Sequence, residues 1–209
     1  KWSTLGMAAA VVAFMVYAIS IAIDFYAVRD VHYSQADQTT INGEEYRFEQ
    51  WNPTRDNGYF VKYYLADQEF KRAWNKRSQL PLYHEDGSGT DLLETAQRYV
   101  TSKGLRKDSV GVSRLTDADI KAIESGIPNY LFLEKNPLWK RIYNTIWEID
   151  RFHNGLGASG GSLTQRFVYW QTAVEIIKDQ PWFGVGTGDV PVDFDAKYEE
   201  LNNLEEQYR

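Results

Sequence analysis

Three glycines at alternate positions are the first feature of this sequence that could serve chemistry. The segment QPWFGVGTGDV, residues 180–190, carries them as Gly184, Gly186 and Gly188. A dinucleotide-binding loop needs the spacing G-x-G-x-x-G between a strand and a helix, and a P-loop needs G-x-x-x-x-G-K-[ST]. Neither spacing occurs here, and a helical pattern precedes the glycines. We therefore predict a sharp turn without a nucleotide, in which Pro181 ends the helix while Trp182 and Phe183 pack inward.

A second chemical feature is the arginine that precedes this turn. Arg166 lies four residues before Trp170, at the edge of an apolar stripe. A guanidinium group beside an aromatic ring can bind a phosphate or a carboxylate through two parallel hydrogen bonds. The alternative is a surface arginine whose aliphatic part covers Trp170, and the spacing by itself favours that alternative.

The remaining titratable residues give little support for other site types. The three histidines are not spaced as metal-ligand pairs, and the chain contains no cysteine. We therefore expect no metal site, no disulfide and no cysteine nucleophile. Acids cluster after the glycines at Asp189, Asp193 and Asp195; they are read as solvated residues at a helix start rather than as a hydrolase pair. The net charge of -6 argues against nucleic-acid binding.

The elements that must position these residues begin with a long apolar segment. Leu5–Ile23 contains 19 residues without a charge, and a helix of that length spans roughly 28 Å, close to the hydrocarbon thickness of a bilayer. A signal peptide and a buried core helix are the alternatives. Residues 1–26 are predicted as a transmembrane helix with its flanks, and residues 27–209 as a water-soluble domain. Since the chain starts at Lys1 and stops at Arg209 inside a charged helical pattern, we expect a fragment of a longer protein.

The soluble part is predicted to be mainly α-helical, with one small antiparallel β element at residues 38–64. Asn42-Gly43 is typical of a type I′ turn, and Asn57-Gly58 precedes a second alternating run. Residues 66–209 read as helices. Their expected N-terminal caps are Thr90, Thr116, Asn136 and Ser162. The helix after Ser162 should bury the stripe Phe167, Trp170, Val174 and Ile177, and the last helix a stripe of Phe194, Tyr198, Leu201 and Tyr208.

Read as a whole, residues 162–190 resemble the signature of the O-antigen ligase and O-antigen polymerase superfamily. That signature is an Arg, a Trp four residues later, a short helix, and then Pro-(aromatic or Leu)-x-Gly-x-Gly-x-Gly. The matching residues are Arg166, Trp170, Pro181, Gly184, Gly186 and Gly188. Residues 24–161 resemble the long extracytoplasmic insertion of Bacteroidetes-type members.

The resemblance implies a multi-pass glycosyltransferase of the bacterial inner membrane, with the soluble part in the periplasm. Such enzymes move a glycan from undecaprenyl diphosphate to lipid A-core, another repeat unit or a protein. They invert the anomeric centre without a metal or cofactor. The resemblance assigns Arg166 to the donor diphosphate, and Trp170 and the three glycines to the shape of the site. The family's histidine, usually followed by Asn, comes after the glycines; none follows Gly188 here, so we expect it beyond Arg209 and the fragment alone to be inactive.

Several alternatives stay open at this point. Ligase, polymerase and protein oligosaccharyltransferase are not separated by these residues. A membrane-anchored, non-catalytic periplasmic interaction domain is the competing class, and further hydrophobic helices in the full gene would exclude it. The basic runs Lys71–Arg77 and Lys103–Lys107 are read as solvated helix faces rather than as contacts to lipid phosphates.

Overall fold

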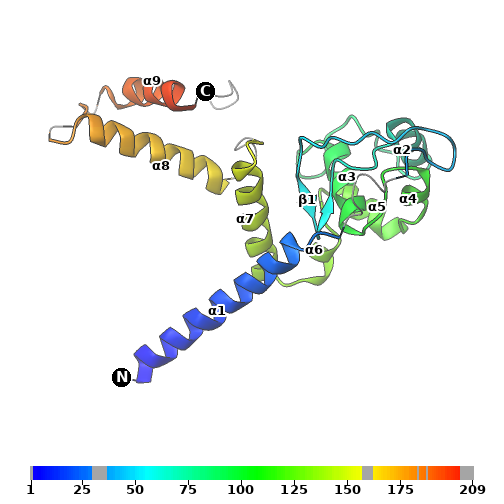
Figure 1. Cartoon of the computed structure of the whole chain (residues 1–209), viewed down its shortest axis with the longest axis horizontal. Coiled ribbons are helices and arrows are strands. Elements are labelled where there is room, and N and C mark those ends of the chain that lie inside the picture. Colours follow the sequence, from blue (N-terminus) through cyan, green and yellow to red (C-terminus); the bar gives the residue numbers. More distant parts are fainter. Residues whose placement is uncertain (1, 30–36, 157–161, 183, 187, 203–209) are drawn as a thin grey trace. The chain divides into compact units, whose positions relative to one another are not determined.

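A computed structural model describes residues 2–29, 37–156, 162–182, 184–186 and 188–202 (Figure 1). The chain forms two compact units, residues 1–147 and residues 148–209. The boundary falls inside the helix α7 (Pro137–His153). In the described residues the fold is mainly α-helical with one small antiparallel sheet, as the sequence predicts.

The first unit begins with the apolar helix α1 (Trp2–Tyr26). Thr4–Tyr26 has a mean hydropathy of 2.3, and its length and composition allow it to cross a membrane. Most of its side chains are exposed, with only 6% of the apolar window buried, which argues against a core helix of a soluble protein. Its last turns pack through Ile21 and Phe25 against Trp139 and Tyr143 of α7.

The predicted β element is smaller than expected. Strands β1 (Arg55–Asp56) and β2 (Tyr59–Phe60) pair antiparallel around Asn57-Gly58, and both turn residues have the positive φ that a type I′ turn requires, 51° and 85°. The alternation then breaks at Tyr64, which also has a positive φ of 54°.

The type I′ prediction for Asn42-Gly43 is wrong. Only Gly43 has a positive φ there. The Thr40 hydroxyl accepts hydrogen bonds from the backbone N–H groups of Asn42 and Glu44, and this side chain organises the turn in place of the backbone pattern.

Beyond α1 and the hairpin, this unit contains α3 and four shorter helices. They are α2 (Asp67–Trp74), α3 (Leu92–Ser102), α4 (Ser109–Ser113), α5 (Asp117–Glu124) and α6 (Leu131–Glu134). Their core is built around large, fully buried side chains, including Trp74, Leu92, Tyr99, Val112 and Ile123. Burial of such side chains is the main term that stabilises the unit.

Two of the four predicted helix caps are confirmed, Thr116 at α5 and Asn136, whose Oδ1 accepts from the Trp139 N–H at 2.9 Å. Ser162 is the first residue of α8 (Ser162–Asp179), and its side chain lies outside the described residues. Thr116 and Asp119 form the predicted reciprocal capping box of α5. The cap of α3 is Asp91, whose carboxylate accepts from the Leu93 N–H at 2.8 Å, and not Thr90. The Thr90 N–H instead donates to Asp86 at 3.1 Å, which places Thr90 in the preceding turn.

The second unit contains α8 (Ser162–Asp179) and α9 (Val190–Asn202), which run antiparallel and pack side by side (Figure 1). Val168 and Tyr198 are the buried contact, with Phe194 packed against them. The side of α8 that carries Val168 is therefore the covered side. Tyr208, predicted for the last stripe, lies outside the described residues, as does the side chain of Leu201.

The predicted buried stripe of α8 is wrong, because its four side chains face solvent. The exposed fractions are 59% for Phe167, 64% for Trp170, 48% for Val174 and 63% for Ile177. The helix has apolar residues on more than one side, and α9 covers the side of Val168 and Thr172 instead. We call Phe167, Trp170, Val174 and Ile177 the exposed stripe.

Candidate functional site

The structure places Arg166 and Trp170 one turn apart on α8, both exposed. Residues four apart are neighbours on a helix surface. Among the described residues, Arg166 has no hydrogen-bond or ion-pair partner. In the described part of the chain its guanidinium is thus unengaged, and the exposed stripe supplies an apolar surface beside it.

The glycines form the connection between α8 and α9. The Gly184 N–H donates to the Gln180 carbonyl at 3.1 Å, and Gly184 has a φ of +60°, which a residue with a side chain adopts only at a cost. The Gly186 carbonyl accepts from the N–H groups of Asp189 and Val190 and so begins α9. At Gly184 and Gly188 none of the described residues other than the chain neighbours lies within 4 Å of where a Cβ would stand.

The inward packing predicted for Trp182 is wrong, since this side chain is 89% exposed. The turn closes through backbone hydrogen bonds and does not need Trp182 as a core residue. Phe183 lies outside the described residues. Trp182 thus adds another exposed aromatic ring next to the glycines.

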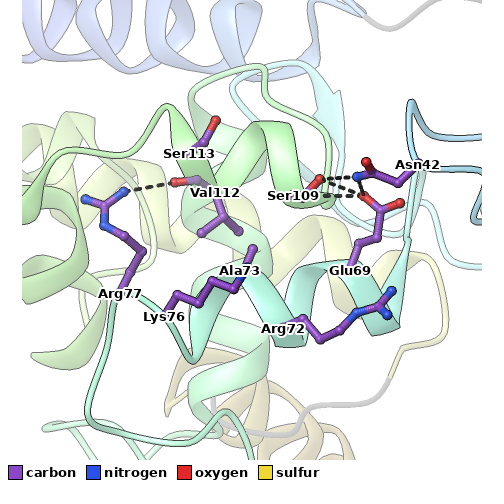
Figure 2. A pocket seen from close by; sticks show the side chains of 9 residues that line it. All are labelled: Asn42, Glu69, Arg72, Ala73, Lys76, Arg77, Ser109, Val112 and Ser113. Carbon is purple, nitrogen blue, oxygen red and sulfur yellow. Dashed lines mark hydrogen bonds between the residues drawn. The ribbon is translucent and has the colours of Figure 1, made fainter.

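A separate cleft lies in the first unit, between α2 and α4 (Figure 2). Its volume is about 630 Å³. The residues that line it are Asn42, Glu69, Arg72, Ala73, Lys76, Arg77, Ser109, Val112 and Ser113. Of this set only the basic side chains within Lys71–Arg77 stand out in the sequence, where they are predicted to form a solvated face.

Glu69 is the acidic group of this cleft, and it is fully engaged. Its carboxylate accepts hydrogen bonds from the Thr40 hydroxyl, from Asn42 Nδ2 at 3.0 Å and from Ser109 Oγ at 2.7 Å. Burial by itself would raise the pKa of Glu69, but these donors outweigh it and lower the pKa to about 2. Glu69 is therefore ionised, and its charge is directed at protein donors.

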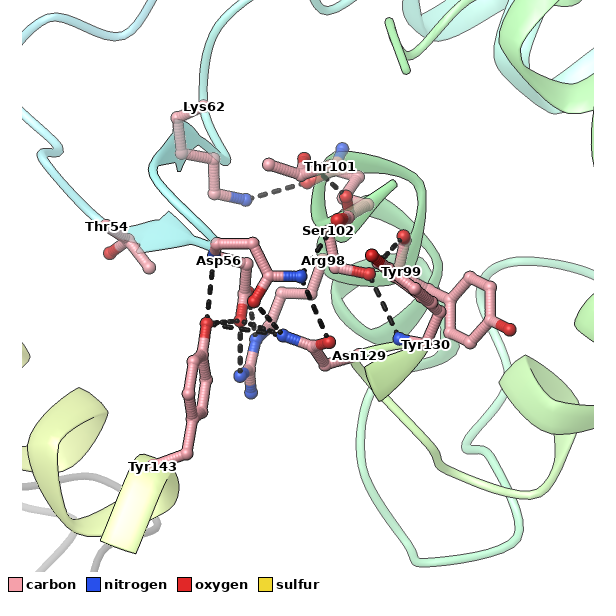
Figure 3. A network of polar contacts seen from close by, with 12 residues as sticks. Thr54, Asp56, Lys62, Arg98, Tyr99, Thr101, Ser102, Asn129, Tyr130 and Tyr143 are labelled. Carbon is pink, nitrogen blue, oxygen red and sulfur yellow. Dashed lines mark hydrogen bonds and ion pairs between the residues drawn. The ribbon is translucent and has the colours of Figure 1, made fainter. Parts of the chain in front are cut away.

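A buried polar network joins the β hairpin to α3 and α7 (Figure 3). Arg98 Nε donates to Asp56 Oδ2 at 2.9 Å, and the Arg98 guanidinium carbon lies 3.8 Å from the centre of the Trp147 ring. The Tyr143 hydroxyl donates to Asp56 Oδ1 at 3.1 Å and accepts from the Asn57 N–H at 2.9 Å.

The network is closed to solvent, so its role is to position elements. The Asp56 side chain is 0% exposed and that of Arg98 is 10% exposed. Burial by itself would lower the pKa of Arg98, but the charge of Asp56 outweighs burial and raises that pKa, so the guanidinium stays protonated. Burial next to the Asp56 charge likewise raises the pKa of Tyr143 well above its usual value, and the hydroxyl stays protonated.

The acids and histidines in the described ranges form no metal-binding group. Within the described ranges no group of three or more His, Asp or Glu side chains could hold a metal ion. Asp193 lies in the first turn of α9, as expected of an acid at a helix start. His84 contacts the ring of Tyr83, and His32 lies outside the described residues.

Comparison with other proteins adds no assignment to these sites. No protein-family model, no curated protein and no solved structure matches this chain.

Proposed function

We propose that this chain is part of an integral-membrane glycosyltransferase that moves a glycan from undecaprenyl diphosphate to an acceptor, in the manner of an O-antigen ligase. The observation that carries the proposal is the exposed face of α8, where Arg166 has no partner among the described residues and stands one turn from Trp170. A guanidinium that is not engaged by a protein carboxylate can bind both oxygens of a phosphate.

The surroundings of Arg166 suit a donor that is attached to a lipid. The exposed stripe and Trp182 are apolar or aromatic and face solvent, and tryptophan is enriched where proteins meet the membrane interface. The same chain contains α1, which is long and apolar enough to cross a membrane. We propose further that this membrane is the bacterial inner membrane and that the part of the chain after α1 lies on its periplasmic side.

In the reaction, a hydroxyl of the acceptor attacks the anomeric carbon and the bond from that carbon to the diphosphate oxygen breaks. The configuration at that carbon is inverted. Arg166 neutralises negative charge that develops on the leaving diphosphate, a task that a fixed cation performs without a metal. The hydroxyl proton goes to a base supplied by another part of the full-length protein. Trp170, Gly184, Gly186 and Gly188 shape the surface on which the donor lies.

The test is Arg166→Ala in the full-length protein, with surface polysaccharide measured by gel electrophoresis. We expect transfer to fall at least about a hundredfold, the usual effect of removing one group that stabilises charge in a transition state. Lys178→Ala is the matched control, because Lys178 is a cation on the same helix that pairs with Glu175 at 2.6 Å. Normal polysaccharide in the Arg166→Ala strain, at equal protein level, would refute the role of Arg166.

A membrane-anchored interaction domain without catalysis is the second candidate. In the described residues α1 is the one helix that could cross a membrane, and the exposed stripe could equally be covered by a protein. The number of hydrophobic helices in the full gene separates the two, because a single-pass parent excludes the transferase. Polymerase and protein oligosaccharyltransferase differ from the ligase only in the acceptor, and in vitro transfer to each acceptor separates these three.

A further inference from the structure

We propose that the cleft between α2 and α4 binds a phosphate monoester carried by a small hydroxylated molecule, through Lys76 and Arg72. This site lies entirely in the first unit and is distinct from the proposed transfer site on α8. It does not depend on the proposed function.

The cations of the cleft have few partners within the described structure. The Lys76 ammonium has no hydrogen-bond or ion-pair partner among the described residues. Arg72 donates from Nε to the Gln68 carbonyl at 3.2 Å, and one of its terminal nitrogens lies 3.7 Å from the Glu44 carboxylate, beyond hydrogen-bond distance. Both side chains therefore have donors left for a ligand.

Arg77, by contrast, is a fixed wall of the cleft. Its guanidinium donates to the Leu115 carbonyl at 3.0 Å and to Asp117 at 2.8 Å. Its positive charge still contributes to the local potential, while its geometry is set by the protein. The ligand contacts are accordingly assigned to Lys76 and Arg72 and not to Arg77.

The protein compensates the two cations of the cleft only in part, because the Glu44 carboxylate lies 3.7 Å from Arg72 and Lys76 pairs with no described residue. Arg72 lies on α2 and Lys76 in the turn that follows it, so the cleft receives one cation from each. The single buried carboxylate of the cleft, Glu69, already accepts from three protein side chains. An anion bound in the cleft would compensate the charge of Lys76 and accept from the free donors of Arg72.

The size and the other polar groups of the cleft point to more than a bare ion. A volume of about 630 Å³ is far larger than one phosphate needs. Ser113 Oγ donates to the Val110 carbonyl at 2.7 Å and keeps its lone pairs for a ligand hydroxyl. Asn42 uses its Nδ2 on Glu69 and Ser109, which leaves its carbonyl oxygen as a second acceptor. Ala73 and Val112 supply an apolar wall.

The test uses the complete chain in phosphatidylcholine nanodiscs, titrated by calorimetry with inorganic phosphate and with glycerol 3-phosphate. We expect saturable binding that is tighter for glycerol 3-phosphate and that weakens as salt is raised. Lys76→Ala and Arg72→Ala should each weaken binding about tenfold, because each removes a charged hydrogen bond. Lys76→Arg should retain most of the affinity.

The matched control is Lys71→Ala, which removes the same charge as Lys76→Ala from a position on α2 that lines a different cleft. Its affinity should stay within about twofold of the parent chain. An equal loss in Lys71→Ala and Lys76→Ala, or no saturable binding of either probe, overturns the proposal.

A second titration identifies whether the phosphate comes from a membrane lipid or from a soluble ester. The glycerol 3-phosphate titration is repeated in nanodiscs that contain phosphatidic acid. Competition by phosphatidic acid assigns the site to a membrane lipid headgroup, and unchanged affinity assigns it to a soluble ester. Both results support a phosphate monoester site and differ only in where the ester comes from.

Discussion

Replacement of Asp56 by Asn is expected to destabilise the first unit more than any surface substitution. Asparagine keeps the shape of the side chain but removes the charge that compensates Arg98, which is 2.9 Å away. Arg98 cannot turn out to water easily, because its side chain is 10% exposed and its guanidinium lies against the ring of Trp147. Leaving one member of a buried ion pair without its partner costs about 3–5 kcal/mol.

Tyr143→Phe tests the same network by removing one hydroxyl instead of a charge, and its loss of stability can be compared with that of Asp56→Asn. It removes one hydroxyl that accepts from the Asn57 N–H at 2.9 Å and donates to Asp56 at 3.1 Å. Because the N–H of Asn57 is then buried without an acceptor, the expected cost is about 1–3 kcal/mol. The double variant should lose less than the sum of the single losses, since both substitutions break the contact between Tyr143 and Asp56.

The assay is urea unfolding of the complete chain in mild detergent, followed by tryptophan fluorescence. Asp67→Asn is the matched control, because Asp67 forms an exposed ion pair with Arg47 at 2.7 Å, and its loss should cost less than about 1 kcal/mol. A cost below about 1 kcal/mol for Asp56→Asn would refute the reasoning. It would mean that the charge of Arg98 does not depend on Asp56.

Two further predictions concern acid and glycine. Since the pKa of Glu69 is lowered to about 2 from an ordinary 4.5, its contribution to folding is complete above pH 4.5 and is lost as the pH falls towards 2. The free energy of unfolding should therefore drop less between pH 7 and pH 3 in Glu69→Gln than in the parent chain, and an equal drop would exclude Glu69 as a source. Gly58→Ala should cost about 1–3 kcal/mol more than Gly43→Ala in urea unfolding. Both glycines have positive φ, but only at Gly58 would the new Cβ lie 1.9 Å from a backbone oxygen, that of Ala27; equal losses would refute the clash.

Local features of this fold could be predicted from the sequence because nearby residues decide them. The capping box of Thr116 and Asp119 and the Asn57-Gly58 turn each depend on residues within a few positions of one another. The length and apolar composition of α1 are likewise sequence properties. Thr90 and Asp91 are both good caps, so the sequence alone could not choose between them.

Long-range features could not be predicted, because they depend on which elements meet. Asp56 and Arg98 are 42 positions apart, and no local pattern indicates that they form a buried pair. The prediction of the buried side of α8 was wrong for a similar reason. The helix has more than one apolar side, and the position of α9 decides which of them is covered. The cleft of Lys76 needs both α2 and α4, so the basic residues alone suggested only a solvated face.

The contacts at the C-terminal end of α1 fix the direction of this helix relative to the hairpin and α7. The ring of Phe25 meets that of Tyr143 edge to face at 5.4 Å, and the Arg29 N–H donates to the Gly58 carbonyl at 2.9 Å. Tyr143 belongs to the buried polar network and Gly58 to the turn of the hairpin, so a tilt of α1 would strain both. A tilt of about 5° at this end displaces the far end of a helix of 25 residues by roughly 3 Å. If α1 crosses a bilayer, a change in bilayer thickness that alters the tilt of α1 would therefore strain the contacts of Phe25 and Arg29.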